Sequence, residues 1–224
     1  MKTINSILAL IIREFRLSYR NFSDILSIFI FFLLGIIIFV FSIGPDKDIF
    51  NKLGIGIIWT LLLLSNNLSL KKFYQDDFDN GNIILLHMSG LSYEIITLIK
   101  LFCMWFLFQL PFFIIIPIAM IILDIDILNI KLIFFNFLIG SPILTSIVSI
   151  SASMNLLNKK NFTLGSLIVM ILSIPIIIFS VNIIDASQEI IVAQTKILLG
   201  ILFFFLAVTP WISASCIKLA LQNK

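Results

Sequence analysis

Charged side chains that could do chemistry are concentrated in one short stretch, residues 71–79. The segment KKFYQDDFD places two lysines and three aspartates within nine residues. Lys72 and Asp76 are four residues apart and can pair on one face of a helix. The only histidine in the sequence, His87, follows in the same loop, and a lone loop histidine is usually solvated or packed. These residue types indicate ion pairing and docking rather than catalysis.

No motif for catalysis or cofactor binding accompanies this stretch. The sequence contains no GxxxxGK[ST] phosphate-binding loop, no HExxH and no GxSxG. Cys103 and Cys216 form no CxxC or CxxCH motif, so we expect them to be small apolar fillers. No histidine lies in a span or outer loop where it could bind a haem. We therefore expect no enzyme, no catalytic residue, no metal site and no directly bound cofactor.

The composition is that of an integral membrane protein. Of 224 residues 60% are hydrophobic, and 12% are charged against about 25% in soluble domains. A bilayer core needs about 20 apolar residues per spanning helix. The sequence predicts an all-α membrane protein with six such spans, near 25–43, 53–70, 95–123, 130–157, 162–184 and 197–221. We expect residues 1–224 to form a single transmembrane domain, with the overlong third span tilted or kinked at its prolines.

The distribution of basic residues predicts the orientation in the membrane. Eleven lysines and arginines fall on one side of the predicted spans and four on the other, which places both termini in the cytoplasm. Because the basic residues follow the membrane segments, the net charge of +3 does not indicate nucleic-acid binding. Residues 2–22 predict a basic amphipathic helix at the membrane surface, with Arg13, Arg16 and Arg20 on its polar face. This helix is either a topological anchor among lipid headgroups or a docking surface for a partner.

The loop at residues 71–90 predicts a short helix, a stop and a second apolar segment. Phe73 is expected at the membrane interface. Asp79-Asn80-Gly81 is a stop signal, in which Gly81 suits a left-handed conformation after a helix. The apolar run 83–86 includes Ile84 and has little reason to be exposed unless it packs on something. The loop is therefore either an ordinary solvated loop or a docking element for a soluble cytoplasmic protein.

One further polar feature lies inside the spans, and acidic residues are absent there. Gly140, Ser141, Thr145, Ser149 and Ser153 form a ridge along the fourth span, which favours close helix packing over a polar translocation path. No aspartate or glutamate lies deep in a span, which disfavours an ion-coupled transporter.

The predicted interface helix, six spans and charged-then-apolar loop resemble the permeases of type-2 ABC exporters. Seven short motifs occur in the order expected for the haem exporter protein B family, the membrane permease of the cytochrome c maturation ABC complex. The motifs are FSIGPD (41–46), GIIWTLLLLS (56–65), DDFDNG (76–81), LPFFIIIP (110–117), GSPIL (140–144), SIPIIIF (173–179) and TPW (209–211).

The resemblance implies a homodimer that carries two ATP-hydrolysing partner subunits on its cytoplasmic face and joins haem-handling membrane subunits. ATP, bound by the partner, would drive release of a haem-loaded chaperone. The family's coupling loop maps to residues 71–90, its acidic pair to Asp76 and Asp77, and its turn glycine to Gly81. Relatives often place an acid where this chain has Ile84, so contact there is expected to be apolar.

We therefore expect the ATPase-coupling residues to be Lys72, Phe73, Asp76, Asp77, Gly81 and Ile84. The expected location is a bacterial inner membrane or, because the composition is typical of AT-rich genomes, a mitochondrial inner membrane. Two other readings stay open: a type-2 exporter permease for a lipid, glycan or drug, and a non-transporting membrane scaffold.

Overall fold

The computed structural model describes residues 2–44, 46–125, 130–157, 163–182 and 187–223. The described residues form helices connected by short turns, with no strand among them, which confirms the predicted all-α class. In chain order they are α1 (Lys2–Arg20), α2 (Phe22–Ile43), α3 (Lys47–Asn67), α4 (Leu70–Asp79), α5 (Asn82–Met88), α6 (Tyr93–Met104), the π-helix η1 (Trp105–Gln109), α7 (Phe112–Ile122), α8 (Ile130–Leu157), α9 (Thr163–Val181) and α10 (Gln188–Gln222).

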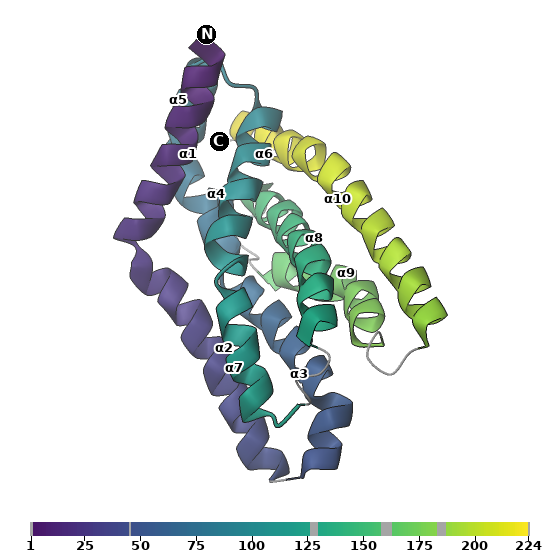
Figure 1. Ribbon diagram of the computed structural model, residues 1–224. Helices are drawn as coiled ribbons and strands as arrows, with labels where there is room; N and C mark the ends of the chain where they lie inside the picture. The colour runs from purple at the N-terminus through teal and green to yellow at the C-terminus, as the bar shows by residue number, and fades with distance from the viewer. Residues whose placement is uncertain (1, 45, 126–129, 158–162, 183–186, 224) are drawn as a thin grey trace.

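Within the described residues, six helical segments are long and apolar enough to cross a membrane, in agreement with the six predicted spans. The first begins at Phe22, where α1 meets α2 at a bend at Asn21 (Figure 1). The last begins earlier than expected, because α10 starts at Gln188 and includes most of the predicted outer loop 185–196. Gly200 is the first glycine in α10 and Pro210 lies farther along, so no helix-breaking residue interrupts its first turns.

A π-helical turn, η1, divides the third span, which we expected to be tilted or kinked at its prolines. Pro111 follows η1 and has no N–H to donate to the preceding turn, which disrupts the regular α-helical hydrogen bonds. The wider turn brings two polar side chains to neighbouring helices. The Gln109 Nε2 donates to the Asn66 Oδ1 at 2.5 Å, and the Trp105 Nε1 donates to the Ser141 Oγ at 3.0 Å. The break therefore connects the third span to α3 and α8 inside the bundle.

α8 is the best-buried span of the bundle, and it packs on α9, α10 and α4. Its ridge from Gly140 to Ser153 is buried, which supports the packing interpretation. Gly140 leaves the room that the indole of Trp59 fills. The N-terminal end of α1 and the C-terminal end of α10 lie at the same end of the molecule as α5. The α2–α3 connection lies at the opposite end (Figure 1). The predicted division into one domain stays a prediction.

Candidate functional site

The helical hairpin α4–α5 corresponds to the predicted coupling loop. Gly81 joins the two helices with φ +74°, which confirms the predicted left-handed conformation. Ser92 begins α6, and its Oγ accepts the Ile95 N–H at 3.4 Å. The sequence folds locally as a helix, a left-handed stop and a second helix, and this turn presents α5 at one end of the molecule (Figure 1).

One face of α4 is buried in the protein core. Phe73, Tyr74 and Phe78 are each no more than 1% exposed. The Tyr74 hydroxyl lies 2.7 Å from the Ser149 Oγ of α8, which in turn lies 3.3 Å from the Ser213 Oγ of α10. The expectation that Phe73 sits at the membrane interface is wrong, because its helix face packs on α8 instead of facing lipid.

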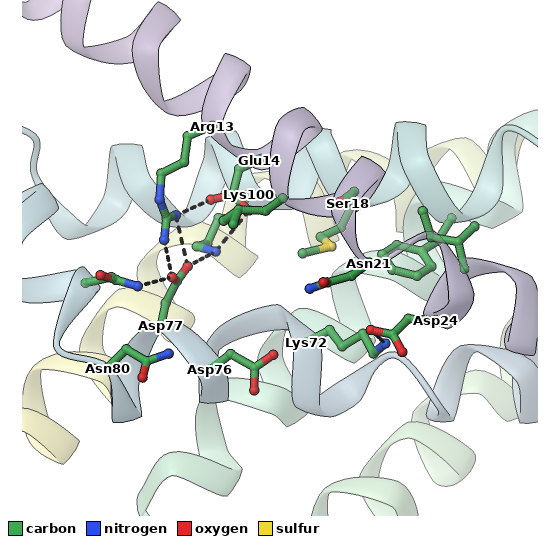
Figure 2. A pocket seen from close by; sticks show the side chains of 15 residues that line it. Arg13, Glu14, Ser18, Asn21, Asp24, Lys72, Asp76, Asp77, Asn80 and Lys100 are labelled. Atoms are coloured by element: carbon green, nitrogen blue, oxygen red, sulfur yellow. Dashed lines mark hydrogen bonds and ion pairs between the residues drawn. The ribbon is translucent and has the colours of Figure 1, made fainter.

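Four charged side chains form a group between α1, α4 and α6, here called the charge cluster: the half-buried Arg13 and the buried Glu14, Asp77 and Lys100 (Figure 2). The Lys100 Nζ lies 2.5 Å from the Asp77 Oδ2 and 3.2 Å from the Glu14 Oε2. Arg13 donates to Glu14 at 2.7 Å and also pairs with Asp77. Each cation therefore contacts both acids, and the cluster carries no net charge.

Because these side chains are shielded from water, their ion pairs matter more for stability than exposed pairs would. The side chains of Lys100 and Glu14 are 1% and 3% exposed, and charges held away from water need close partners. Burial disfavours the charged guanidinium of Arg13, but the hydrogen bonds and charges of Asp77 and Glu14 outweigh it and raise the pKa of Arg13 above its ordinary value. Arg13 thus stays cationic, as the cluster requires.

The structure corrects the predicted polar face of the N-terminal helix. Arg16 and Arg20 are exposed, as expected for side chains that face headgroups or a partner. Arg13 turns toward the protein and pairs with Asp77 of α4, 64 residues away in the sequence. The opposite charges on α4 and α6 account for the difference, because a carboxylate within reach binds the guanidinium more strongly than water does.

A pocket of about 260 Å³ opens beside the charge cluster, between α1, α2, α4 and α6. Asn21, Asp76 and Asn80 are among the residues that line it (Figure 2). Lys72 pairs there with Asp24 of α2. The predicted pair Lys72–Asp76 is therefore replaced by a contact between helices. Asp76 itself is exposed, so the two neighbouring aspartates have different surroundings.

The exposed side of the hairpin is apolar on α5. Ile84, Leu85 and Met88 are 40%, 63% and 77% exposed, and together they are here called the α5 strip. Ile83, by contrast, is fully buried and anchors α5 to the core. The same hairpin also carries exposed charged or polar residues, among them Asp79 and His87, whereas the exposed Asp76 lines the pocket. An apolar surface with a polar rim is typical of a protein interface.

Lys100 and Glu14 are functional candidates that sequence reasoning missed. In the sequence analysis Lys100 was only one of the eleven basic residues that predict the orientation in the membrane. Glu14 was given no role. The available signal was a lysine within an otherwise apolar span, which calls for an acidic partner. The partner could not be identified, because Glu14 lies 86 residues away in the sequence.

The described residues include no group of three or more histidine, cysteine, aspartate or glutamate side chains that could hold a metal ion. His87 is exposed, and its ring makes two contacts within the protein. Its Nδ1 lies 2.9 Å from the Leu91 carbonyl oxygen, and its ring stacks on Tyr93 with centroids 4.2 Å apart. The arrangement of the site is therefore suited to ion pairing and docking.

Comparison with known proteins identifies the family. A family model described as CcmB protein matches residues 5–220. Heme exporter protein B of Haemophilus influenzae is 29% identical over 218 residues, which cover 96% of this chain and 99% of the relative. Heme exporter protein B of Rhodobacter capsulatus is 26% identical over 216 residues, which cover 96% and 99%. The same protein of Bradyrhizobium diazoefficiens is 28% identical over 169 residues, which cover 75% and 76%. These matches confirm the resemblance that the sequence motifs indicated, and the chain belongs to the CcmB protein family.

Proposed function

We propose that this chain is the membrane permease subunit of an ABC transporter complex for cytochrome c maturation, which exports or delivers haem. The observation that carries the proposal is the family match over almost the whole chain, together with relatives named heme exporter protein B. Six apolar helices and the bacterial relatives support a multi-pass protein of the bacterial inner membrane. Both termini, and the hairpin end with them, would then face the cytoplasm.

The proposed mechanism assigns ATP hydrolysis to a separate partner subunit that docks on the α5 strip. Ile84, Leu85 and Met88 would offer the apolar contact, and exposed charges elsewhere on the hairpin, such as Asp79, would fix the orientation of the partner. Movement of the docked partner would displace the α4–α5 hairpin and drive release of a haem-loaded chaperone. In this proposal the chain functions as a homodimer, and other membrane subunits of the pathway handle the haem.

Affinity purification of the tagged chain from its host membrane tests this function. Leu85→Glu places a charge in the α5 strip, and Asn80→Glu places the same charge on the pocket side of the hairpin. We expect a P-loop ATPase and haem-handling membrane proteins to co-purify with the wild type and with Asn80→Glu. A buried unpaired charge costs several kcal/mol, so we expect at least about tenfold less ATPase with Leu85→Glu.

Other outcomes would change the proposal in defined ways. An ATPase that co-purifies without haem-handling proteins would indicate an exporter for a lipid, glycan or drug. Absence of any ATPase from the wild-type complex would contradict the proposed function and favour a membrane scaffold. Equal recovery of the ATPase with Leu85→Glu would move the docking surface away from the α5 strip.

A further inference from the structure

Docking on α5 does not by itself explain how a push on the hairpin reaches the membrane spans. We propose that Glu14 and Lys100 are positioning residues that fix the α4–α5 hairpin to α1 and to the third span, so that these elements move as one body. This inference rests on the proposed function, in which an ATPase partner displaces the hairpin.

Lys100 lies where three elements meet. It belongs to α6, within the third span, and its Nζ contacts Glu14 of α1 at 3.2 Å and Asp77 of α4 at 2.5 Å. Its side chain is only 1% exposed. A single ammonium group therefore ties the N-terminal helix and the hairpin to the span that the push must move.

The remaining pairs close the charge cluster into a ring. Arg13 contacts Glu14 and Asp77, so both acids are shared between the same two cations. Separation of α4 or of α6 from the other two helices would leave Asp77 or Lys100 without a partner, which is far more costly than breaking an exposed pair. Apolar side chains can slide past one another and form new contacts, whereas the ring fixes one arrangement.

A second contact supports the same direction of transmission. Lys72 of α4 pairs with Asp24 near the start of α2, and Asp24 is more exposed than the acids of the charge cluster. α4 is thus joined by charge to α1 and α6 through Asp77 and to α2 through Lys72. The residues of the α5 strip, by contrast, are exposed on the second helix of the same hairpin. The proposed docking surface, the α5 strip, is therefore separate from the charge cluster, which would transmit movement of the hairpin to α1 and to the third span.

The test is the double variant E14Q/K100M, assayed in the complete complex. It removes one positive and one negative charge together and leaves Arg13 paired with Asp77, so no buried charge is left alone. We expect the ATPase to co-purify at wild-type levels and its ATP hydrolysis to persist. The yield of haem-bearing cytochrome c per ATP hydrolysed should fall about tenfold, a usual size for coupling between distant sites.

The control variant E94Q/K218M removes another ion pair of α6, whose Nζ and Oε1 atoms lie 2.6 Å apart and whose side chains are more exposed. We expect its yield per ATP to match that of the wild type. A purely structural role for the charge cluster would lower the amount of complex without changing that ratio. An unchanged ratio in E14Q/K100M, or loss of the ATPase from the complex, would overturn the positioning role. Absence of an ATPase from the wild-type complex would instead refute the proposed function, and the positioning role with it.

Discussion

Asp77 and Asp76 are adjacent in the sequence but differ in what their carboxylates contact. Asp77 is buried, pairs with Arg13 and Lys100, and accepts a hydrogen bond from the Asn82 Nδ2 at 3.0 Å. Asp76 is exposed at the edge of the pocket. A docking role shared equally by the two acids is therefore difficult to reconcile with their positions. We assign Asp77 to internal pairing and keep Asp76 as the acid available at the surface.

The first prediction compares the two aspartates by substitution. Asp77→Asn leaves Arg13 and Lys100 with one acid between them, so we expect the free energy of unfolding to fall by about 3 kcal/mol. Asp76→Asn removes an exposed charge and should change it by less than about 0.5 kcal/mol. Unfolding of the purified variants in mild detergent measures both. Equal stability of the two variants would contradict the buried cluster.

The second prediction concerns the turn glycine. Gly81 has φ +74°, and a Cβ there would meet no other atom within 4 Å, so Gly81→Ala tests backbone strain alone. We expect it to destabilise the protein by about 1–2 kcal/mol. Gly200→Ala is the matched control, because Gly200 also has open space but lies in α10, where alanine is favoured by up to about 1 kcal/mol. Opposite shifts in the unfolding midpoint would agree with the prediction, whereas a stabilised Gly81→Ala would contradict it.

Sequence reasoning succeeded at the residue scale where the cause is local. The left-handed conformation of Gly81 follows from the residue types of one turn, Asp79-Asn80-Gly81. The charge cluster could not be predicted, because Arg13 and Asp77 are 64 residues apart and many acids could have met Arg13. The pairing of Lys72 with Asp24 rather than Asp76 has the same origin, since tertiary packing outweighed the spacing along the helix.

Among the elements, α8 depends on small residues for its close packing. A Cβ on Gly140 would overlap the ring of Trp59, which is itself 2% exposed and has little room to move. We therefore expect Gly140→Ala to destabilise the protein by about 1–3 kcal/mol, a usual cost of overpacking. Gly56→Ala in α3 serves as the control, because a Cβ there would meet only Val181, at 4.0 Å. Thermal unfolding in detergent compares them, and a Gly140→Ala midpoint equal to that of Gly56→Ala would disprove close packing at this site.

The helices themselves were predictable to the extent that apolar length determines them. Each predicted span has a long helix, because about 20 apolar residues have few alternatives in a bilayer. The predicted and observed boundaries differ where a helix continues beyond the apolar segment. The last span was predicted to begin at residue 197, whereas α10 begins at Gln188. The kink expected from proline in the third span was found as the π-turn before Pro111, whereas Pro117 lies inside α7. Neither the π-turn nor the hydrogen bond from Gln109 to Asn66 could be read from one sequence.

At the scale of the whole molecule, the proposed orientation gives a further prediction. Lys47 and Met88 are both exposed, on the α2–α3 end and on the hairpin, respectively. In a chain whose Cys103 and Cys216 are replaced by alanine, an impermeant maleimide should label Lys47→Cys in intact spheroplasts. Met88→Cys should react only after the membrane is opened, because basic residues are retained on the cytoplasmic side. The reverse pattern would contradict the orientation and place the α5 strip out of reach of a cytoplasmic ATPase.

The central claim is that this chain serves haem export for cytochrome c maturation through its hairpin. The most direct measurement is the amount of covalently bound haem in cytochromes c of the host after its gene for this chain is deleted. We predict that haem-bearing cytochrome c is lost, that the wild-type chain and Asn80→Glu restore it, and that Leu85→Glu does not, although it reaches the membrane. Normal cytochrome c in the deletion strain would contradict the claimed function, and full restoration by Leu85→Glu would contradict the role of the α5 strip.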